Sequence, residues 1–262
     1  YKNATGALSN SRSDSLVSPR VGLLFQPSEL VSYYASFGTS YNTSGDTYQF
    51  GNPGANTSRT ANTDPEKSRN FEIGSKFELF ERRALLGVAV FRSEKYNERN
   101  TDPDTAAAQE LLSGKRHATG MEFNLAGRFT PQWEVFYNHT WIPSARIEAG
   151  ATTGNAPRLG DRPGLTPKHS ASLWTTYRVT QPLRLGLGLN YRSEQTPATS
   201  RVNVAPAFTT VDAMAEYVIS DRHTLKLNIT NLTDKLYADS LYTGFYVPGA
   251  GRKVQLTLTS LF

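Results

Sequence analysis

The feature that most constrains the fold is an alternation of apolar and polar residues with a period of two. Every second residue is apolar in the stretches 183–191, 224–229 and 253–258. Such alternation predicts β-strands with one apolar and one polar face. About eleven such segments of roughly ten residues occur, the length that a tilted strand needs to cross a membrane. They lie near residues 20–25, 31–38, 71–79, 85–92, 119–129, 133–141, 169–179, 183–192, 209–218, 224–229 and 253–262.

The hydropathy pattern excludes a helical membrane protein. Hydrophobic residues make up 38% of the chain, and the longest apolar run, from Ala84 to Phe91, has only the length of a strand. A membrane helix needs about 20 consecutive apolar residues. A transmembrane β-barrel remains compatible with this composition, because its strands are apolar on only one face.

The predicted connections alternate between short turns and long polar links. Short turns fall at residues 26–29, 80–83, 130–132, 180–182 and 220–222, and long links at 41–66, 95–116, 143–167, 193–206 and 232–251. Outer-membrane barrels have short periplasmic turns and long extracellular loops. We therefore predict an all-β, antiparallel transmembrane barrel wall of about eleven strands. The final strand then runs inward, with Phe262 at the periplasmic edge and residues 1–18 in an extracellular loop.

Seven charged residues within the predicted strands fall on the polar face. They are Glu72, Lys76, Glu122, Arg184, Asp212, Glu216 and Lys226. An arginine or lysine that faces lipid at the bilayer midplane costs about 2–4 kcal/mol. We therefore expect this face to line a wet lumen and the apolar face to meet outer-membrane lipid.

No motif for catalysis or metal binding is present in the sequence. The chain has no cysteine, and its four histidines form no His-Glu-x-x-His motif. A Gly-x-Ser-x-Gly nucleophile motif is also missing. We therefore predict no catalytic residue, no metal site and no cofactor. The formal charge is +5, but the basic residues are spread out, so nucleic acid is not an expected partner.

Several motifs in a fixed order carry a family resemblance. Residues 231–237 read Asn-Leu-Thr-Asp-Lys-Leu-Tyr, Gly251-Arg252 opens the last strand, and the chain ends in Phe262. Earlier matches lie at residues 18–22, 33–38 and 65–76. With these motifs the chain resembles TonB-dependent outer-membrane receptors over nearly its whole length. Within that family it resembles siderophore receptors of the catecholate type.

The resemblance implies a barrel of 22 strands with a plugged lumen, located in the bacterial outer membrane. Such a receptor imports ferric siderophore with energy from the TonB complex, so iron would be cargo and not a cofactor. The family's N-terminal plug domain and TonB box have no counterpart here. We interpret residues 1–262 as the C-terminal part of the barrel, about half of its wall. The TonB complex would act on the missing N-terminal region.

Two further expectations concern the ends of the chain. Residues 1–5 show none of the features of a signal peptide, so we expect the export signal upstream of Tyr1. The terminal aromatic Phe262 resembles the signal that the barrel assembly machinery reads. We therefore expect this machinery to be a partner of the last strand.

Ligand contacts are expected from basic and aromatic residues near the outer mouth. Ferric siderophores are anionic, and catecholates carry flat rings on which tyrosine or arginine planes stack. The candidate ligand-binding residues are Arg116, Arg146, Arg158, Arg162, Arg192, Arg201, Tyr242 and Tyr246. Two rival functions remain from the sequence, a passive porin and an outer-membrane barrel enzyme, and the cargo could instead be a vitamin or a sugar.

Overall fold

The computed structural model describes residues 13–43, 64–101, 110–150, 158–198, 200–242 and 244–261. All regular elements in these ranges are strands. They are β1 (Arg20–Ser28), β2 (Val31–Asn42), β3 (Glu66–Leu79), β4 (Ala84–Thr101), β5 (Glu110–Arg128), β6 (Trp133–Ala149), β7 (His169–Arg178), β8 (Leu183–Arg192), β9 (Phe208–Ser220), β10 (His223–Thr230), β11 (Ala238–Tyr242), β12 (Phe245–Pro248) and β13 (Lys253–Ser260). In the described part no helix is long and apolar enough to cross a membrane.

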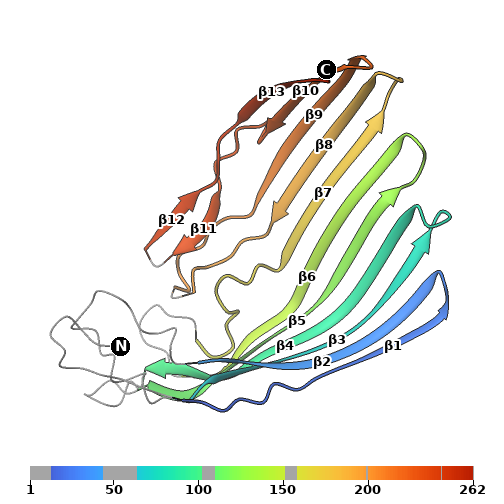
Figure 1. Ribbon diagram of the computed structural model, residues 1–262. Coiled ribbons are helices and arrows are strands. Elements are labelled where there is room, and N and C mark those ends of the chain that lie inside the picture. Colours follow the sequence, from blue (N-terminus) through green and yellow to red (C-terminus); the bar gives the residue numbers. More distant parts are fainter. Residues whose placement is uncertain are drawn as a thin grey trace.

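Eleven of these strands form one curved sheet (Figure 1). Neighbours in the sheet are neighbours in sequence from β1 to β10, and β13 then pairs with β10. Every pairing is antiparallel, as in β3 with β4 and β8 with β9. The eleven predicted strands and their order are therefore confirmed, and β1 and β13 form the two edges of the described sheet.

One face of the sheet is apolar and uncovered. Leu227 pairs with Ala215 on β9 and with Leu256 on β13, so apolar side chains continue across three strands. Leu187 and Leu256 remain 42% and 64% exposed. An exposed apolar surface of this extent requires an apolar environment. Because the backbone is paired within the sheet, lipid satisfies that requirement.

The opposite face carries charged residues such as Glu72, Glu216 and Lys226, as expected from the alternation. Arg184 pairs with Glu216, and Glu216 pairs with Lys226, so their side chains share one row. An Arg184 nitrogen lies 2.8 Å from a Glu216 oxygen. Farther along the same face the Tyr34 hydroxyl donates to Glu72 over 2.6 Å. We call this side the polar face.

The structure corrects the predicted strand ends. β4 continues to Thr101, and β5 begins at Glu110, so both occupy much of the long link expected at 95–116. β6 continues to Ala149, into the link expected at 143–167, and β3 begins at Glu66, at the end of the link expected at 41–66. The link expected at 232–251 contains the hairpin of β11 and β12.

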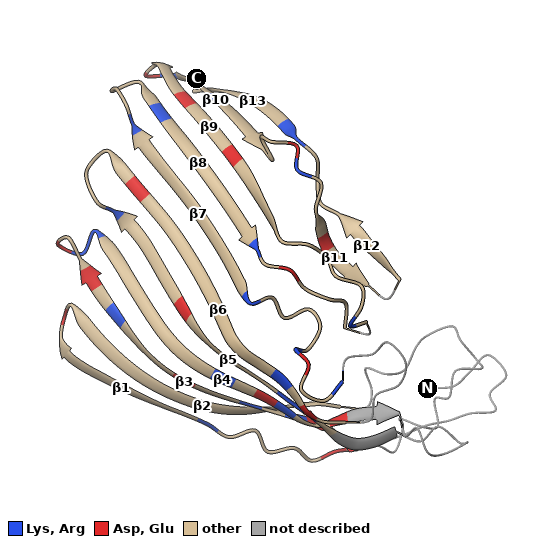
Figure 2. Cartoon of the chain, turned by 180° about the vertical axis from the view of Figure 1, so that it is seen from behind, with Lys and Arg blue, Asp and Glu red and all other residues tan. Residues whose placement is uncertain are grey.

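Hydrophobic periodicity did not predict these strand extensions, because they are polar on both faces. On one face Lys95 lies 3.0 Å from Glu66 and Arg116 lies 2.7 Å from Glu98. On the other face an Arg69 nitrogen lies 2.5 Å from a Glu94 oxygen. Figure 2 shows the resulting concentration of charged positions at the lower ends of β4, β5 and β6. Hydrophobic periodicity cannot detect such strands, which are stabilised by backbone pairing and ion pairs.

Candidate binding site at the outer mouth

The polar face carries a pocket at the end of β6 to β9 that adjoins the long connections. The pairing of the four strands brings two rows of side chains together. They are Asn138–Ser172–Asn190–Thr210 and Thr140–Ser170–Arg192–Phe208. The space above these rows measures about 420 Å³ and is also lined by Tyr237 and Asp239. Most of the floor is therefore neutral and polar, with one cation, one acid and aromatic rings at its rim.

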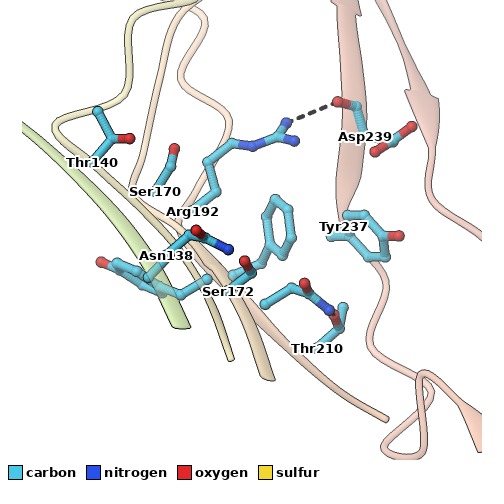
Figure 3. Close-up of a pocket in the computed structure, with 12 residues that line it drawn as sticks. Asn138, Thr140, Ser170, Ser172, Arg192, Thr210, Tyr237 and Asp239 are labelled. Atoms are coloured by element: carbon cyan, nitrogen blue, oxygen red, sulfur yellow. Dashed lines mark hydrogen bonds between the residues drawn. The ribbon is translucent and has the colours of Figure 1, made fainter. Parts of the chain in front are cut away.

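Arg192 is the charged centre of this pocket. Its Nη1 donates to the Asp239 carbonyl oxygen over 2.9 Å, and Figure 3 shows the guanidinium reaching toward Asp239. The guanidinium carbon lies 5.4 Å from the centre of the Phe208 ring. Phe208 in turn stacks on Tyr237, with ring centres 4.4 Å apart. The printed contact of the Arg192 guanidinium is with a neutral carbonyl, so its charge is available to a bound anion.

The position of Tyr237 is fixed by a cluster that joins β10 to β13. We call Asn231, Asp234, Tyr237, Gly249 and Arg252 the closing clasp. The Gly249 nitrogen donates to the Tyr237 carbonyl over 2.9 Å, and the Arg252 nitrogen donates to the Asp234 side chain over 2.8 Å. A Cβ on Gly249 would lie 1.9 Å from the Tyr237 ring, so only glycine allows the ring to lie there.

Asn231 is the most buried member of the clasp, with 2% of its surface exposed. Its side-chain amide donates to the carbonyls of Lys235 and Ala250 over 2.9 and 3.0 Å. The Lys235 backbone nitrogen donates to the Asn231 side-chain oxygen over 2.8 Å, and the Asn231 backbone nitrogen donates to the Asp212 carboxylate over 2.7 Å. The hydrogen bonds of Asn231 thus hold residues 231–237, at the start of the last connection, over the polar face.

A second groove of about 490 Å³ continues from Arg192 between the outer connections. Leu165, Gln195, Asp239 and Tyr242 are among its lining residues. The connections contact each other directly, since the Leu165 nitrogen donates to the Thr196 carbonyl over 2.8 Å. Arg192 and Tyr242, both candidates from the sequence, therefore line one continuous surface.

Three other candidate arginines lie in the connections nearby. The Arg158 backbone nitrogen donates to Asp161 over 2.9 Å, and Arg201 approaches the same carboxylate at 4.0 Å. Arg162 donates to the carbonyls of Ile142, Pro143 and Thr166. Burial lowers the pKa of Arg162. The Arg162 guanidinium therefore holds the connection together, and Asp161 is contacted by the Arg158 backbone and the Arg201 side chain.

The remaining candidates are dispersed. Arg116 lies on the polar face of β5, beside Glu98. Arg146 pairs with His117 on the opposite face. Tyr246 pairs with Leu241 in the hairpin and is half exposed. Phe262 lies outside the described residues.

The arrangement suits an anion with a flat or polar body. Arg192 provides charge, Phe208, Tyr237 and Tyr242 provide rings, and the strand rows provide hydroxyl and amide groups. Both volumes fall in the range of small-molecule sites, about 300–1,000 Å³. Within the described ranges no three His, Cys, Asp or Glu side chains are placed to hold a metal ion.

The sequence matches a family model described as TonB dependent receptor-like, beta-barrel, over residues 1–232. The chain belongs to the TonB-dependent receptor family. The eleven-stranded sheet is accordingly the C-terminal half of a receptor barrel in the bacterial outer membrane. Its polar face lines the lumen.

Individual members of the TonB-dependent receptor family are similar to this chain in sequence. The chain is 31% identical to a probable TonB-dependent receptor, BfrD, of Bordetella pertussis, covering 94% of this chain and 34% of that protein. It is 30% identical to a probable TonB-dependent siderophore receptor, PiuA, of Acinetobacter baumannii, covering 98% and 35%. The chain therefore spans about a third of the length of these relatives.

Solved receptor structures of this family superpose on the sheet. The crystal structure of PiuA matches with a TM-score of 0.80 and 29% identity, covering 92% of this chain and 35% of that one. The closed form of Fiu, a ferric-catecholate import receptor of Escherichia coli K12, matches with a TM-score of 0.78 and 26% identity, covering 93% and 34%.

Several residues of the pocket were missed by the sequence reasoning. Phe208 begins β9, and Asp239 contributes only its backbone carbonyl to Arg192. Tyr237 was noticed as part of a motif, but its contact with Phe208 depends on how the last connection of the receptor folds. Asn138 and Asn190 could have been predicted by continuing the alternation of polar residues to the strand ends, since both pair with Ser172 on the strand between them.

Proposed function

We propose that the chain forms part of the wall of an outer-membrane receptor that binds ferric siderophore and imports it with energy from the TonB complex. The observation that carries the proposal is Arg192, which lies among aromatic rings at the outer mouth and whose guanidinium has no carboxylate partner within the described ranges. Relatives over nearly the whole chain include a protein named as a siderophore receptor. Iron would pass through as part of the cargo.

The family match favours a receptor over a passive porin. The lack of a nucleophile motif in the sequence favours transport over catalysis. In the whole protein we propose that a plug domain fills the lumen beside the polar face and that the TonB complex acts on that domain. The ferric-catecholate receptor Fiu among the similar structures supports a catecholate as the class of siderophore, because such a ligand presents both negative charge and flat rings to Arg192 and its neighbours.

The test replaces Arg192 with glutamine in the full-length receptor. Hydrogen bonds to charged groups contribute about 1.5–3 kcal/mol, so binding of a ferric catecholate should weaken by about ten- to a hundredfold. Its salt dependence should also become flatter, because a positive mouth attracts anions less strongly as salt rises. Binding is measured by quenching of intrinsic fluorescence at several salt concentrations.

The matched control is Arg222→Gln, which removes the same charge at the short turn between β9 and β10. Both variants should assemble as folded barrels, and only Arg192→Gln should lose affinity. Equal affinities and equal salt slopes for the two variants would contradict the proposed site.

A second prediction concerns Phe262 and barrel assembly. In the sequence, Phe262 has the same parity as Val254, Leu256 and Leu258, three apolar residues of the final strand. Deleting Phe262 from the full-length receptor should lower the amount of folded, heat-modifiable barrel in outer membranes, while Phe262→Tyr should preserve it. Unchanged assembly of the deletion at native expression would contradict a role as assembly signal.

A further inference from the structure

A carboxylate lies directly behind the floor of the pocket. Asn190 on β8 pairs with Thr210 on β9, and Asp212 is the next polar-face residue along β9. The Asn190 side-chain nitrogen lies 3.3 Å from an Asp212 carboxylate oxygen and 3.5 Å from the Thr210 hydroxyl. Asn190 and Thr210 line the pocket, and Asp212 lies one row farther from the mouth. An effect of Asp212 on a bound ligand would therefore pass through Asn190.

The Asp212 carboxylate is held in one orientation. Its other oxygen accepts a hydrogen bond from the Asn231 backbone nitrogen over 2.7 Å. Gly188, which pairs with Asp212 across β8, provides the space for this arrangement. A Cβ on Gly188 would lie 3.0 Å from the Asp212 Cβ and 2.9 Å from the Trp174 ring. The two oxygens of Asp212 thus have separate tasks, one toward the closing clasp and one toward the pocket.

This carboxylate decides which way round the Asn190 amide lies. A carboxylate only accepts hydrogen bonds, whereas an asparagine side chain has donors at its nitrogen and an acceptor at its oxygen. If the amide turned over, the Asn190 carbonyl oxygen would lie against an Asp212 oxygen, and the two acceptors would repel each other. Asp212 therefore keeps the Asn190 nitrogen on its own side and leaves the carbonyl oxygen on the opposite side of the amide.

The pocket consequently has two ends with different chemistry. Arg192 lies two residues beyond Asn190 on β8, about 6.6 Å farther out along the strand, and its guanidinium only donates. The oriented Asn190 amide offers an acceptor. A ligand that covers this acceptor without pairing it binds more weakly, because the acceptor loses its hydrogen bond to water. An oriented amide can therefore distinguish between ligands that a freely turning amide would accept equally.

We propose that Asp212 is a positioning residue that fixes the Asn190 amide, so that the pocket selects siderophores with a hydroxyl or amide N–H donor. The inference rests on the proposed function, since it takes the site around Arg192 as the siderophore site. A bound siderophore would lie with its negative charge toward Arg192 and its donor toward Asn190, on the lumen side. Since Asp212 also holds Asn231, the closing clasp and the selective amide depend on the same carboxylate.

The test compares two ferric tris-catecholate complexes as ligands of the full-length receptor. One complex carries N–H and O–H groups in the scaffold that links its rings, and in the other these groups are methylated. The native receptor should bind the methylated complex about tenfold or more weakly. Affinities are measured by quenching of intrinsic fluorescence, and the ratio of the two affinities is the quantity of interest.

Asp212→Asn should reduce this ratio to about one. The introduced amide can still accept from the Asn231 backbone nitrogen through its oxygen, so the clasp and the assembled barrel should persist. Its nitrogen would then face Asn190, whose amide turns over and offers donors to the pocket in place of an acceptor. Asp221→Asn, which removes the same charge at the short turn between β9 and β10, should keep the native ratio.

A swapped pair separates this role from a general effect on folding. Asn190→Asp combined with Asp212→Asn keeps the total charge, and the amide at position 212 can donate to the carboxylate at position 190. The second oxygen of that carboxylate again offers an acceptor to the pocket. The swapped pair should therefore regain the preference for the unmethylated complex.

A purely structural role of Asp212 would weaken both complexes equally and leave their ratio unchanged in Asp212→Asn, and that result would overturn the inference. The absence of a preference in the native receptor, or of its recovery in the swapped pair, would overturn it as well. Loss of affinity in Arg192→Gln alongside an unchanged ratio in Asp212→Asn would refute only the role of Asp212. A native receptor that bound neither complex would refute the proposed function, and this inference with it.

Discussion

Replacing Leu227 with arginine should destabilise the assembled barrel by about 2–4 kcal/mol, the cost of a basic side chain that faces lipid near the bilayer midplane. Leu227 lies in the middle of β10, and its neighbours on the same face are Ala215 and Leu256. No polar group across the strands would receive the guanidinium there. The free energy of unfolding is obtained from urea titrations of the full-length receptor in phospholipid vesicles.

The matched control is Asn228→Arg, one residue further along the same strand. Asn228 pairs with Met214 and Gln255 on the polar face, so its replacement points into the lumen. It should cost much less than Leu227→Arg, because water in the lumen can solvate the charge. A larger loss of stability in Asn228→Arg than in Leu227→Arg would show that the two faces have been assigned the wrong way round.

Sequence periodicity was sufficient to predict the strand segments that cross the membrane. It could not predict the parts of the strands that lie outside the membrane. In β8 and β10 a strict alternation follows from lipid on one side and water on the other. In the outer part of β5 both sides are wet, and residues such as Lys115 and Arg116 are polar on both faces. Only the pairing partner on β4 or β6 reveals that the strand continues.

Arg146 shows a second limit of prediction from periodicity. A β-bulge changes the face of the sheet on which the following residues lie. Trp141 and Arg146 differ by five residues, so simple alternation would place them on opposite faces. The pairs Met121–Trp141 and Thr119–Ser144 show one extra residue on β6 between them. Such a bulge shifts the following side chains to the other face. Arg146 consequently lies on the same face as Trp141, paired with His117, although the sequence suggested a place at the mouth.

The candidate site was predictable only in part for a similar reason. Arg192 and Tyr242 could be chosen because basic and aromatic residues near the outer mouth suit an anionic ligand. Their convergence depends on the fold of three connections that have no periodic pattern. Arg162 illustrates the difference, since its contacts with backbone carbonyls make it a part of the loop structure.

Loss of the closing clasp should have the largest effect on assembly. Asn231→Ala removes partners from the Lys235 nitrogen and from the carbonyls of Lys235 and Ala250. Each buried polar group left without a partner costs about 1–3 kcal/mol. Asn231 also has a positive φ of 50°, which asparagine tolerates better than alanine. The folded, heat-modifiable fraction of the full-length receptor should therefore fall sharply, while Leu236→Ala, at a 70% exposed position of the same connection, should leave it unchanged.

Gly249→Ala should act through one identified contact, which makes the clasp testable without removing any hydrogen-bonding side chain. The new methyl group would overlap the Tyr237 ring and push it from its stack on Phe208, beside Arg192. We therefore expect both weaker assembly and weaker binding of a ferric catecholate by the barrels that do assemble. Adding Tyr237→Ala removes the overlap, so the double variant should recover assembly relative to Gly249→Ala while its ligand affinity stays low. If the double variant assembled no better than Gly249→Ala, overlap with the ring would not be the reason for glycine at this position, and the connection between the clasp and the binding site would lose its physical basis.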